Sequence, residues 1–128
     1  MITVCAGVAF NNGNILIAKR KKSPFKNFWE FPGGKIEKNE SPELCLKREI
    51  KEELSVDIEI ISFLHQKIHN YEENTIKLLF YNIRLLSYEI KLIDHIEFRW
   101  EKISNLHKYK FPEADFELIS KLERDFKI

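Results

Sequence analysis

The segment GGKIEKNESPELCLKREIKEEL, residues 33–54, joins two glycines to a run of acidic residues. Ser41 followed by Pro42 predicts a helix start, because a serine hydroxyl caps free amides and proline fits the first helical position. The helix is expected to continue to the end of the segment. Gly33 and Gly34 predict a sharp turn and a close approach of the backbone just before it. The segment therefore predicts a glycine loop followed by an acidic helix.

Three glutamates share one face of this helix. Glu49, Glu52 and Glu53 stand at i, i+3 and i+4, within an arc of about 100°. Such a face is either a solvated surface, relieved by an ion pair between Arg48 and Glu52, or a site for a hard cation. Mg²⁺ prefers carboxylate oxygens together with substrate phosphates. The glycine loop favours the metal site, because its carbonyls can face a cation while its amides and Lys35 face phosphate oxygens.

The composition limits the classes of partner. A chain of 128 residues with 44% hydrophobic residues is expected to form one folded domain, residues 1–128. A net charge of +1 argues against binding to duplex nucleic acid through charge alone. A small charged substrate, met by a local cluster of side chains, remains possible. The chain is expected to act as a monomer.

The cysteines and the hydrophobic runs bear on the expected location of the protein. Cys5 and Cys45 lie in apolar surroundings at a spacing that suits neither a zinc site nor a disulfide framework, so both are expected in the core. The start MITVCAGVAF lacks the charged residues of a signal peptide. Because no run approaches the roughly 20 apolar residues that span a bilayer, no membrane partner is expected. The expected location is the cytoplasm.

Strands at the start, one helix between the strand segments and one helix at the end predict an α/β domain built on a mixed sheet. Asn12 and Gly13 form the pair favoured in tight hairpins, and polar residues 69–74 predict a longer hairpin loop. Pro112 is expected to open a final helix, in which apolar residues from Leu118 to Phe126 recur at helical spacing. The expected strands cover residues 2–10, 14–20, 56–68, 75–86 and 96–103.

The acidic segment resembles the signature of the Nudix hydrolases, G-x5-E-x7-R-E-h-x-E-E-x-G-h, where h is a bulky aliphatic residue. One position departs from it: Ser55 stands where the signature has glycine. Because serine tolerates a left-handed turn less well than glycine, the exit from the helix is expected to differ. The matching residues are Gly34, Glu40, Arg48, Glu49, Ile50, Glu52, Glu53 and Val56.

Flanking segments are similar to the MutT-like branch of that family. WEFPGGKIE resembles the approach to the signature, and FPEAD resembles the closing motif near the C-terminus. DHIEFRW resembles an E-H-x-x-x-R-W segment, with Asp94 in place of glutamate. The resemblance spans nearly the whole chain. It implies a Nudix α/β/α sandwich and the hydrolysis of a nucleoside diphosphate linked to a further group.

The resemblance also implies roles for the acidic residues. Glu52 and Glu53 would bind Mg²⁺, or Mn²⁺ in its place, with the Gly33 carbonyl completing part of the shell. Glu49 would be a further ligand or the general base. Arg48 is expected to orient a glutamate through paired hydrogen bonds. Asp94 is either a ligand, one methylene shorter than the family's glutamate, or an ordinary loop residue, while Glu37 and Glu40 are expected to have supporting roles.

Four further residues are candidates for substrate binding. Arg20 and Lys35 would face phosphates, although residues 19–22 also fit a solvated basic run. Phe31, like Phe111, would either stack on the base or belong to the core. Asp115 precedes Leu118, Ile119 and Leu122 by three, four and seven residues, so it lies on the apolar stripe of its helix.

A carboxylate on an apolar stripe needs hydrogen-bond donors. Asp115 is either a cap of its helix or, as in the resembling branch, a contact to the nucleobase edge. A carboxylate accepts from N1–H and N2–H₂ of guanine or from N4–H₂ of cytosine, so both bases remain possible.

The resemblance implies an Mg²⁺-dependent nucleoside triphosphate pyrophosphohydrolase that releases a monophosphate and pyrophosphate. The first expected substrate is 8-oxo-dGTP, whose removal from the nucleotide pool protects DNA from mutation. CTP or a modified dCTP is the alternative substrate. Two alternatives of other classes are a non-catalytic nucleotide-binding Nudix domain and a scaffold domain with an acidic face.

Overall fold

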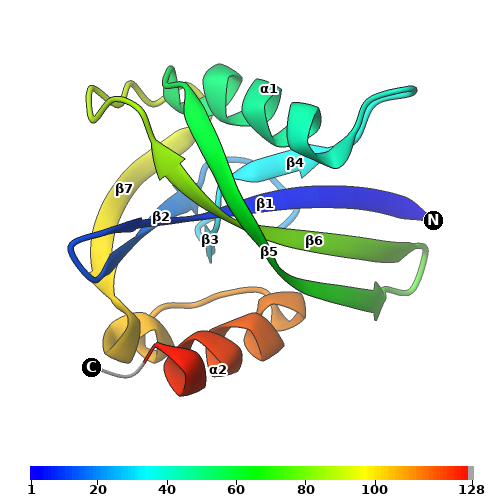
Figure 1. Cartoon of the computed structure of the whole chain (residues 1–128). Coiled ribbons are helices and arrows are strands. Elements are labelled where there is room, and N and C mark those ends of the chain that lie inside the picture. The colour runs from blue at the N-terminus through cyan, green and yellow to red at the C-terminus, as the bar shows by residue number, and fades with distance from the viewer. Residues whose placement is uncertain (127–128) are drawn as a thin grey trace.

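The computed structural model describes residues 1–126, in which seven strands form one sheet. Helix α1 (Pro42–Leu54) covers one face of this sheet and helix α2 (Phe116–Asp125) the other (Figure 1). The three layers confirm the expected α/β sandwich. The strands are β1 (Ile2–Asn11), β2 (Asn14–Arg20), β3 (Trp29–Glu30), β4 (Gly33–Lys35), β5 (Ile58–Asn70), β6 (Thr75–Leu85) and β7 (His95–Lys102).

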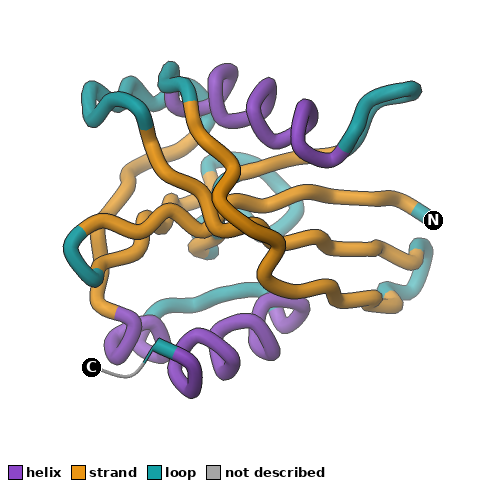
Figure 2. Tube along the Cα trace, in the orientation of Figure 1, coloured by secondary structure: helices purple, strands orange, loops and turns teal. Residues whose placement is uncertain are grey.

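The sheet is mixed, as predicted. Its strands follow the order β3-β2-β1-β6-β5, with β4 paired to β1 and β7 paired to β2. Strands β1 and β6 run parallel, from Ile2 opposite Ile76 to Ala9 opposite Ile83, and the other pairs are antiparallel. The tube in Figure 2 traces these strands as one layer between the helices. Short β4 therefore places the glycine loop beside the central strand.

Both predicted hairpins are present. Asn12 and Gly13 take positive φ angles of 52° and 81°, which suits the two-residue turn between β1 and β2. The longer hairpin joins β5 and β6, whose pairing extends to Asn70 opposite Thr75. Its turn is closed by a hydrogen bond in which the Tyr71 amide donates to the Asn74 carbonyl at 2.8 Å.

Side chains of β1 alternate between two hydrophobic clusters. Cys5 belongs to the cluster that includes Cys45 and Ile50 of α1, whereas Val8 belongs to the cluster that includes Leu118 of α2. Both cysteines are free and fully buried, which confirms their predicted place in the core. Burial raises the pKa of the Cys5 thiol to about 11 and that of the Cys45 thiol to about 12.

Helix α1 begins and ends at the predicted residues. The Ser41 hydroxyl accepts a hydrogen bond from the Leu44 amide at 3.2 Å. At the other end Ser55 takes a left-handed conformation, with φ 63° and ψ 28°, and its amide donates to the Lys51 carbonyl at 3.1 Å. The exit therefore keeps the conformation that glycine adopts, contrary to expectation. A left-handed serine costs about 1–2 kcal/mol, and its hydroxyl donates to the Lys91 carbonyl at 3.4 Å.

The C-terminal region differs from its prediction in detail. The final helix does not start at Pro112: a 3₁₀ turn, Glu113–Asp115, comes first and α2 begins at Phe116. Phe126 lies just beyond α2, with its ring 5.0 Å from that of Phe10. A second 3₁₀ segment, Ile103–Lys108, was not predicted, because its few apolar residues give no clear period. No helix within residues 1–126 is long and apolar enough to cross a bilayer.

Candidate active site

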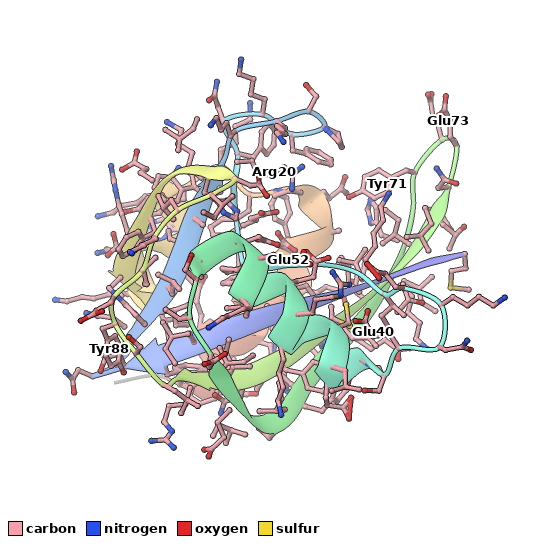
Figure 3. The ribbon with its side chains drawn as sticks, turned by 90° about the horizontal axis from the view of Figure 1, so that it is seen from above. Arg20, Glu40, Glu52, Tyr71, Glu73 and Tyr88 are labelled. Carbon is pink, nitrogen blue, oxygen red and sulfur yellow. The ribbon has the colours of Figure 1, made fainter. Side chains whose placement is uncertain are left out.

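Arg48 gathers the carboxylates of the acidic helix. Its Nε and Nη2 donate to the two oxygens of Glu40 at 2.7 and 2.9 Å, and its Nη1 donates to Glu49 at 2.8 Å and to Glu52 at 3.3 Å. This pairing lowers the pKa of Glu40 to about 2. Figure 3 looks down on α1, with Glu40 and Glu52 beside it. Arg48 thus holds Glu49 in one orientation while Glu40 anchors Arg48.

The two glycines of the loop are required for different reasons. A Cβ on Gly33 would stand 1.8 Å from the Cys5 carbonyl oxygen, because this residue pairs with Ala6 across β4 and β1. A Cβ on Gly34 would stand 2.3 Å from the carboxylate carbon of Glu49. Gly33 therefore lets the loop join the sheet, and Gly34 leaves room for an acidic side chain.

Glu53 is the most unusual acidic residue of the helix. It is only 7% exposed, and its Oε1 has no hydrogen-bond partner among residues 1–126. Burial, together with the charges of Glu30 and Glu49, raises its pKa to about 10. A buried, crowded carboxylate needs either a proton or a cation. The donor set of Glu53, Glu49 and the Gly33 loop fits a hard divalent cation, which takes oxygen ligands.

Two residues that were not predicted lie beside Glu53. Glu30, on β3, accepts a hydrogen bond from Arg20 at 2.8 Å through Oε1, and its Oε2 lies 2.7 Å from Nε2 of His95. His95 is buried at the start of β7, 3.7 Å from Glu53 Oε1. In the sequence Glu30 stands between Trp29 and Phe31, which are both buried. A carboxylate between two core aromatic residues is the sequence signal that could have identified Glu30 as a site residue.

A cavity of about 210 Å³ opens above these residues. Asp94 lies in its wall, but its side chain is 51% exposed and pairs with Lys22 at 3.6 Å. The structure therefore brings Asp94 near Glu53 without burying it. Arg20 lines the same cavity. The remaining lining residues are Lys21, Lys22, Glu30, Gly33, Glu53 and His95.

A larger cavity of about 410 Å³ adjoins the first and shares Arg20, Glu30 and Gly33 with it. Lys35 lines it from β4, and Asp115 lines it from the start of α2. The two neighbouring cavities together form the candidate site: Glu53 and Asp94 line the first, and Phe31 and Tyr71 line the second.

Asp115 is buried in this larger cavity. It is 7% exposed, and its side chain makes no capping hydrogen bond within the described chain. Burial, reinforced by the charge of Glu30, raises its pKa to about 8. The geometry therefore does not support the capping role that was the alternative for this residue. A neutral carboxyl at the wall of a cavity is free to meet a ligand.

Three aromatic residues, Phe25, Phe31 and Tyr71, also line this cavity. Phe31 lines the cavity but is only 3% exposed and stacks on Phe111 at 5.2 Å, so it belongs mainly to the core. Tyr71, which was not predicted, lies in the turn after β5, and Phe25 approaches it to 6.0 Å from the loop after β2. Figure 3 shows Tyr71 at the base of the turn that carries Glu73.

Known proteins resemble nearly the whole chain. The NUDIX domain family matches residues 1–122. The 8-oxo-dGTP diphosphatase of Proteus vulgaris is 41% identical over 80 residues, 61% of this chain and 71% of the relative. The enzyme of the same name from Buchnera aphidicola (subsp. Schizaphis graminum) is 31% identical over 122 residues, 94% of this chain and 92% of the relative.

Two further comparisons agree with these. The CTP pyrophosphohydrolase of Escherichia coli is 39% identical over 70 residues, 52% of each chain. The crystal structure of a MutT NUDIX hydrolase from Burkholderia pseudomallei superposes with a TM-score of 0.86 at 25% identity, covering 94% of this chain and 97% of that one. With the family match over nearly all of its length, the chain belongs to the Nudix family and is a Nudix hydrolase.

Proposed function

We propose that this Nudix hydrolase cleaves nucleoside triphosphates to a monophosphate and pyrophosphate with Mg²⁺, and that 8-oxo-dGTP is its main substrate. One observation carries the proposal: the cavity beside Glu53 and the cavity lined by Asp115 share Arg20, Glu30 and Gly33 in their walls. A ligand with phosphates at one end and a base at the other fits such a paired site. The names of the relatives support the same substrate class.

The acidic residues would hold the metal. Glu52, Glu53 and the Gly33 carbonyl would bind Mg²⁺, with Glu49 as a further ligand or as the general base, and Mn²⁺ is expected to substitute. The bound ion supplies neutralisation of phosphate charge and a lower pKa for its water. Arg48 keeps Glu49 in place through its 2.8 Å hydrogen bond, so the carboxylate meets the reacting water in a fixed orientation.

The basic residues and Asp115 would position the substrate. Arg20 and Lys35 line the shared site and would donate to phosphate oxygens. With its raised pKa, Asp115 is mostly neutral at pH 7 and offers one O–H donor and one acceptor oxygen. Guanine presents O6 as an acceptor beside the N1–H donor, which matches this pattern. Cytosine presents an N4–H₂ donor and an N3 acceptor, so CTP remains the alternative substrate.

A panel of nucleotides tests the proposal. Purified protein with Mg²⁺ is expected to release pyrophosphate from 8-oxo-dGTP with a higher kcat/KM than from dGTP, CTP or dCTP. Preference for CTP would support the alternative. Turnover confined to sugar nucleotides or dinucleoside polyphosphates would reject both, and binding without turnover would identify a non-catalytic domain. We further propose that the enzyme acts as a monomer in the cytoplasm, without duplex nucleic acid or membrane partners.

Substituting Asp115→Asn is expected to change base preference and stability together. The ratio of kcat/KM for 8-oxo-dGTP to that for CTP should change by about tenfold or more, because a carboxyl can carry its proton on either oxygen or lose it, whereas the asparagine amide always donates from nitrogen and accepts at oxygen. The folded pKa lies near 8 and the ordinary value is 3.8, so the contribution of Asp115 to wild-type stability declines as pH rises from about 4 to 8. The gain in Tm of the variant should therefore grow over this range.

Thermal melts from pH 4 to pH 9 and kinetics with both nucleotides measure these effects. Glu113→Gln is the matched control, because Glu113 is an exposed neighbour in the same turn. An Asp115→Asn enzyme with unchanged base preference would remove this residue from the binding site.

A further inference from the structure

Glu30, Glu53 and His95 form a cluster of possible metal ligands in which Glu30 and His95 are not among the proposed Mg²⁺ ligands. One ligand atom from each residue lies within 4.8 Å of the other two. The three side chains come from β3, α1 and β7, so they converge only in the folded chain. Glu30 is partly buried, and the side chains of Glu53 and His95 are 9% and 3% exposed.

Ordinary hydrogen bonding satisfies only part of this cluster. Glu30 Oε1 is paired with Arg20, and its Oε2 faces His95 Nε2 at 2.7 Å. Glu53 Oε1 lies 3.7 Å from the same nitrogen, too far for a hydrogen bond, and has no other partner in the part of the chain that the structure describes. A carboxylate oxygen that is nine-tenths buried and lies beside an imidazole nitrogen and a second carboxylate indicates a place where a cation would bind.

We propose that Glu30, Glu53 and His95 form a site for a first-row divalent transition-metal ion such as Zn²⁺. Two carboxylate oxygens and one imidazole nitrogen are ligands that Zn²⁺ takes in proteins, whereas Mg²⁺ takes oxygen ligands. The cavity of about 210 Å³ next to the cluster has room for water to complete the shell. The site is distinct from the proposed Mg²⁺ set because it includes nitrogen, and it shares only Glu53 with that set.

Binding requires a lone pair on His95 Nε2. This nitrogen faces two carboxylates, while Nδ1 is buried without a partner among residues 1–126. In the metal-bound protein the ring proton would reside on Nδ1. Nε2 would then bind the ion, in place of the hydrogen bond that it makes to Glu30 in the free protein. Arg20 remains on the far oxygen of Glu30 and orients that carboxylate.

Sharing of Glu53 has a functional consequence. Because one buried carboxylate serves both cation sites, Zn²⁺ and Mg²⁺ compete for it, and Zn²⁺ inhibits Mg²⁺-dependent turnover. The proposed Zn²⁺ site is a property of the protein without substrate and does not depend on which nucleotide is hydrolysed. If Zn²⁺ does not bind there, the proposed nucleotide hydrolysis is unaffected.

Nitrogen NMR of the full chain, labelled with ¹⁵N only in histidine, tests the proposal. The chain has four histidines, at positions 65, 69, 95 and 107. Addition of one equivalent of Zn²⁺ is expected to move one Nε2 resonance to the range of a metal-bound imidazole, and Mg²⁺ is not expected to do so. A triple variant, H65Q/H69Q/H107Q, should retain this response, because His95 is then the only histidine. This design does not depend on the folding of a His95 variant.

Binding measurements provide the second arm. His95→Gln and Glu30→Gln are each expected to weaken Zn²⁺ binding at least about tenfold and to change Mg²⁺ binding by less than about threefold. His107→Gln, at an exposed position, is the matched control and should change neither. Absence of a metal-shifted resonance in the wild type, or its loss in the triple variant, would overturn the proposal. So would equal losses of Zn²⁺ and Mg²⁺ affinity in Glu30→Gln.

Discussion

Glu53→Gln is expected to reduce turnover on the order of 1,000-fold while making the metal-free protein more stable at pH 8. A ligand that helps to stabilise transition-state charge contributes several kcal/mol to catalysis, which accounts for the loss. The gain in stability has a different origin. Glu53 is buried beside Glu30 and Glu49, so its carboxyl must take up a proton when the protein folds at pH 8. A glutamine of nearly the same shape is neutral in both states and removes this cost.

The effect on stability depends on pH with a defined sign. The folded pKa of Glu53 is about 10 and its ordinary value is 4.5. A group with a raised folded pKa contributes its full stability below the unfolded pKa and loses it as pH rises through the folded value. The Tm difference between Glu53→Gln and wild type should therefore be small at pH 4 and should increase up to about pH 10.

Melting curves with and without Mg²⁺ provide the measurement. Metal is expected to raise the Tm of the wild type, because it binds the folded state, and to leave Glu53→Gln nearly unchanged. Glu52→Gln is the matched control: its side chain is 57% exposed, so turnover should fall without a gain in stability. A Glu53→Gln protein that is less stable than wild type at pH 8 would contradict the proposed electrostatic strain.

Alanine at Gly33 and alanine at Gly34 are expected to fail in different ways. In Gly33→Ala the new Cβ meets backbone, 1.8 Å from the Cys5 carbonyl oxygen and 2.8 Å from Ala6 Cα. These atoms cannot move without opening the pairing of β4 with β1. Overpacking of this kind costs about 1–3 kcal/mol or more, so Tm should fall on the order of 10 °C.

In Gly34→Ala the new Cβ meets the end of a side chain instead. The Glu49 carboxylate, 2.3 Å away, can swing aside, so the expected change in Tm is small. Arg48 holds that carboxylate at 2.8 Å, and its displacement disturbs the site. A misplacement of about 1 Å costs on the order of 100-fold in rate. Gly34→Ala should therefore melt like wild type and turn over about 100-fold more slowly.

Melting curves and Mg²⁺-dependent kinetics on both variants separate the two cases. Gly13→Ala is the control for a loss of stability away from the site. Gly13 has a φ of 81° in the hairpin between β1 and β2, so its substitution should lower Tm without a specific loss of activity. Similar Tm values for Gly33→Ala and Gly34→Ala would contradict the assignment of Gly33 to the packing of the sheet and of Gly34 to the geometry of the active site.

The acidic helix was predictable from sequence because its signals are local. Ser41 and Pro42 mark its start within one turn, and the spacing of Glu49, Glu52 and Glu53 follows from the helical period. A hairpin turn also depends on neighbouring residues, so the turn at Asn12 and Gly13 could be predicted directly from the sequence. The position of Asp115 on an apolar stripe also anticipated its burial, although the first turn of its helix is a 3₁₀ turn.

Residues that converge through tertiary structure could not be predicted in the same way. Glu30 and His95 are 65 positions apart, and only the pairing of β2 with both β3 and β7 brings them to 2.7 Å. Tyr71 enters the site through the turn of a hairpin whose twist no local pattern specifies. The exposure of Asp94 depends on the same geometry, since the course of the loop before β7 decides whether a short side chain faces the cavity or Lys22.

The burial of the two cysteines bears on durability in oxidising conditions. Peroxides attack the thiolate form of cysteine, and both thiols are fully buried with pKa values of about 11 and 12. The single methionine, Met1, stands at the chain's first position, where its oxidation would not disturb the core. An enzyme proposed to remove oxidised nucleotides would thus present few targets to the chemistry that creates its substrate, and would keep working while that damage accumulates.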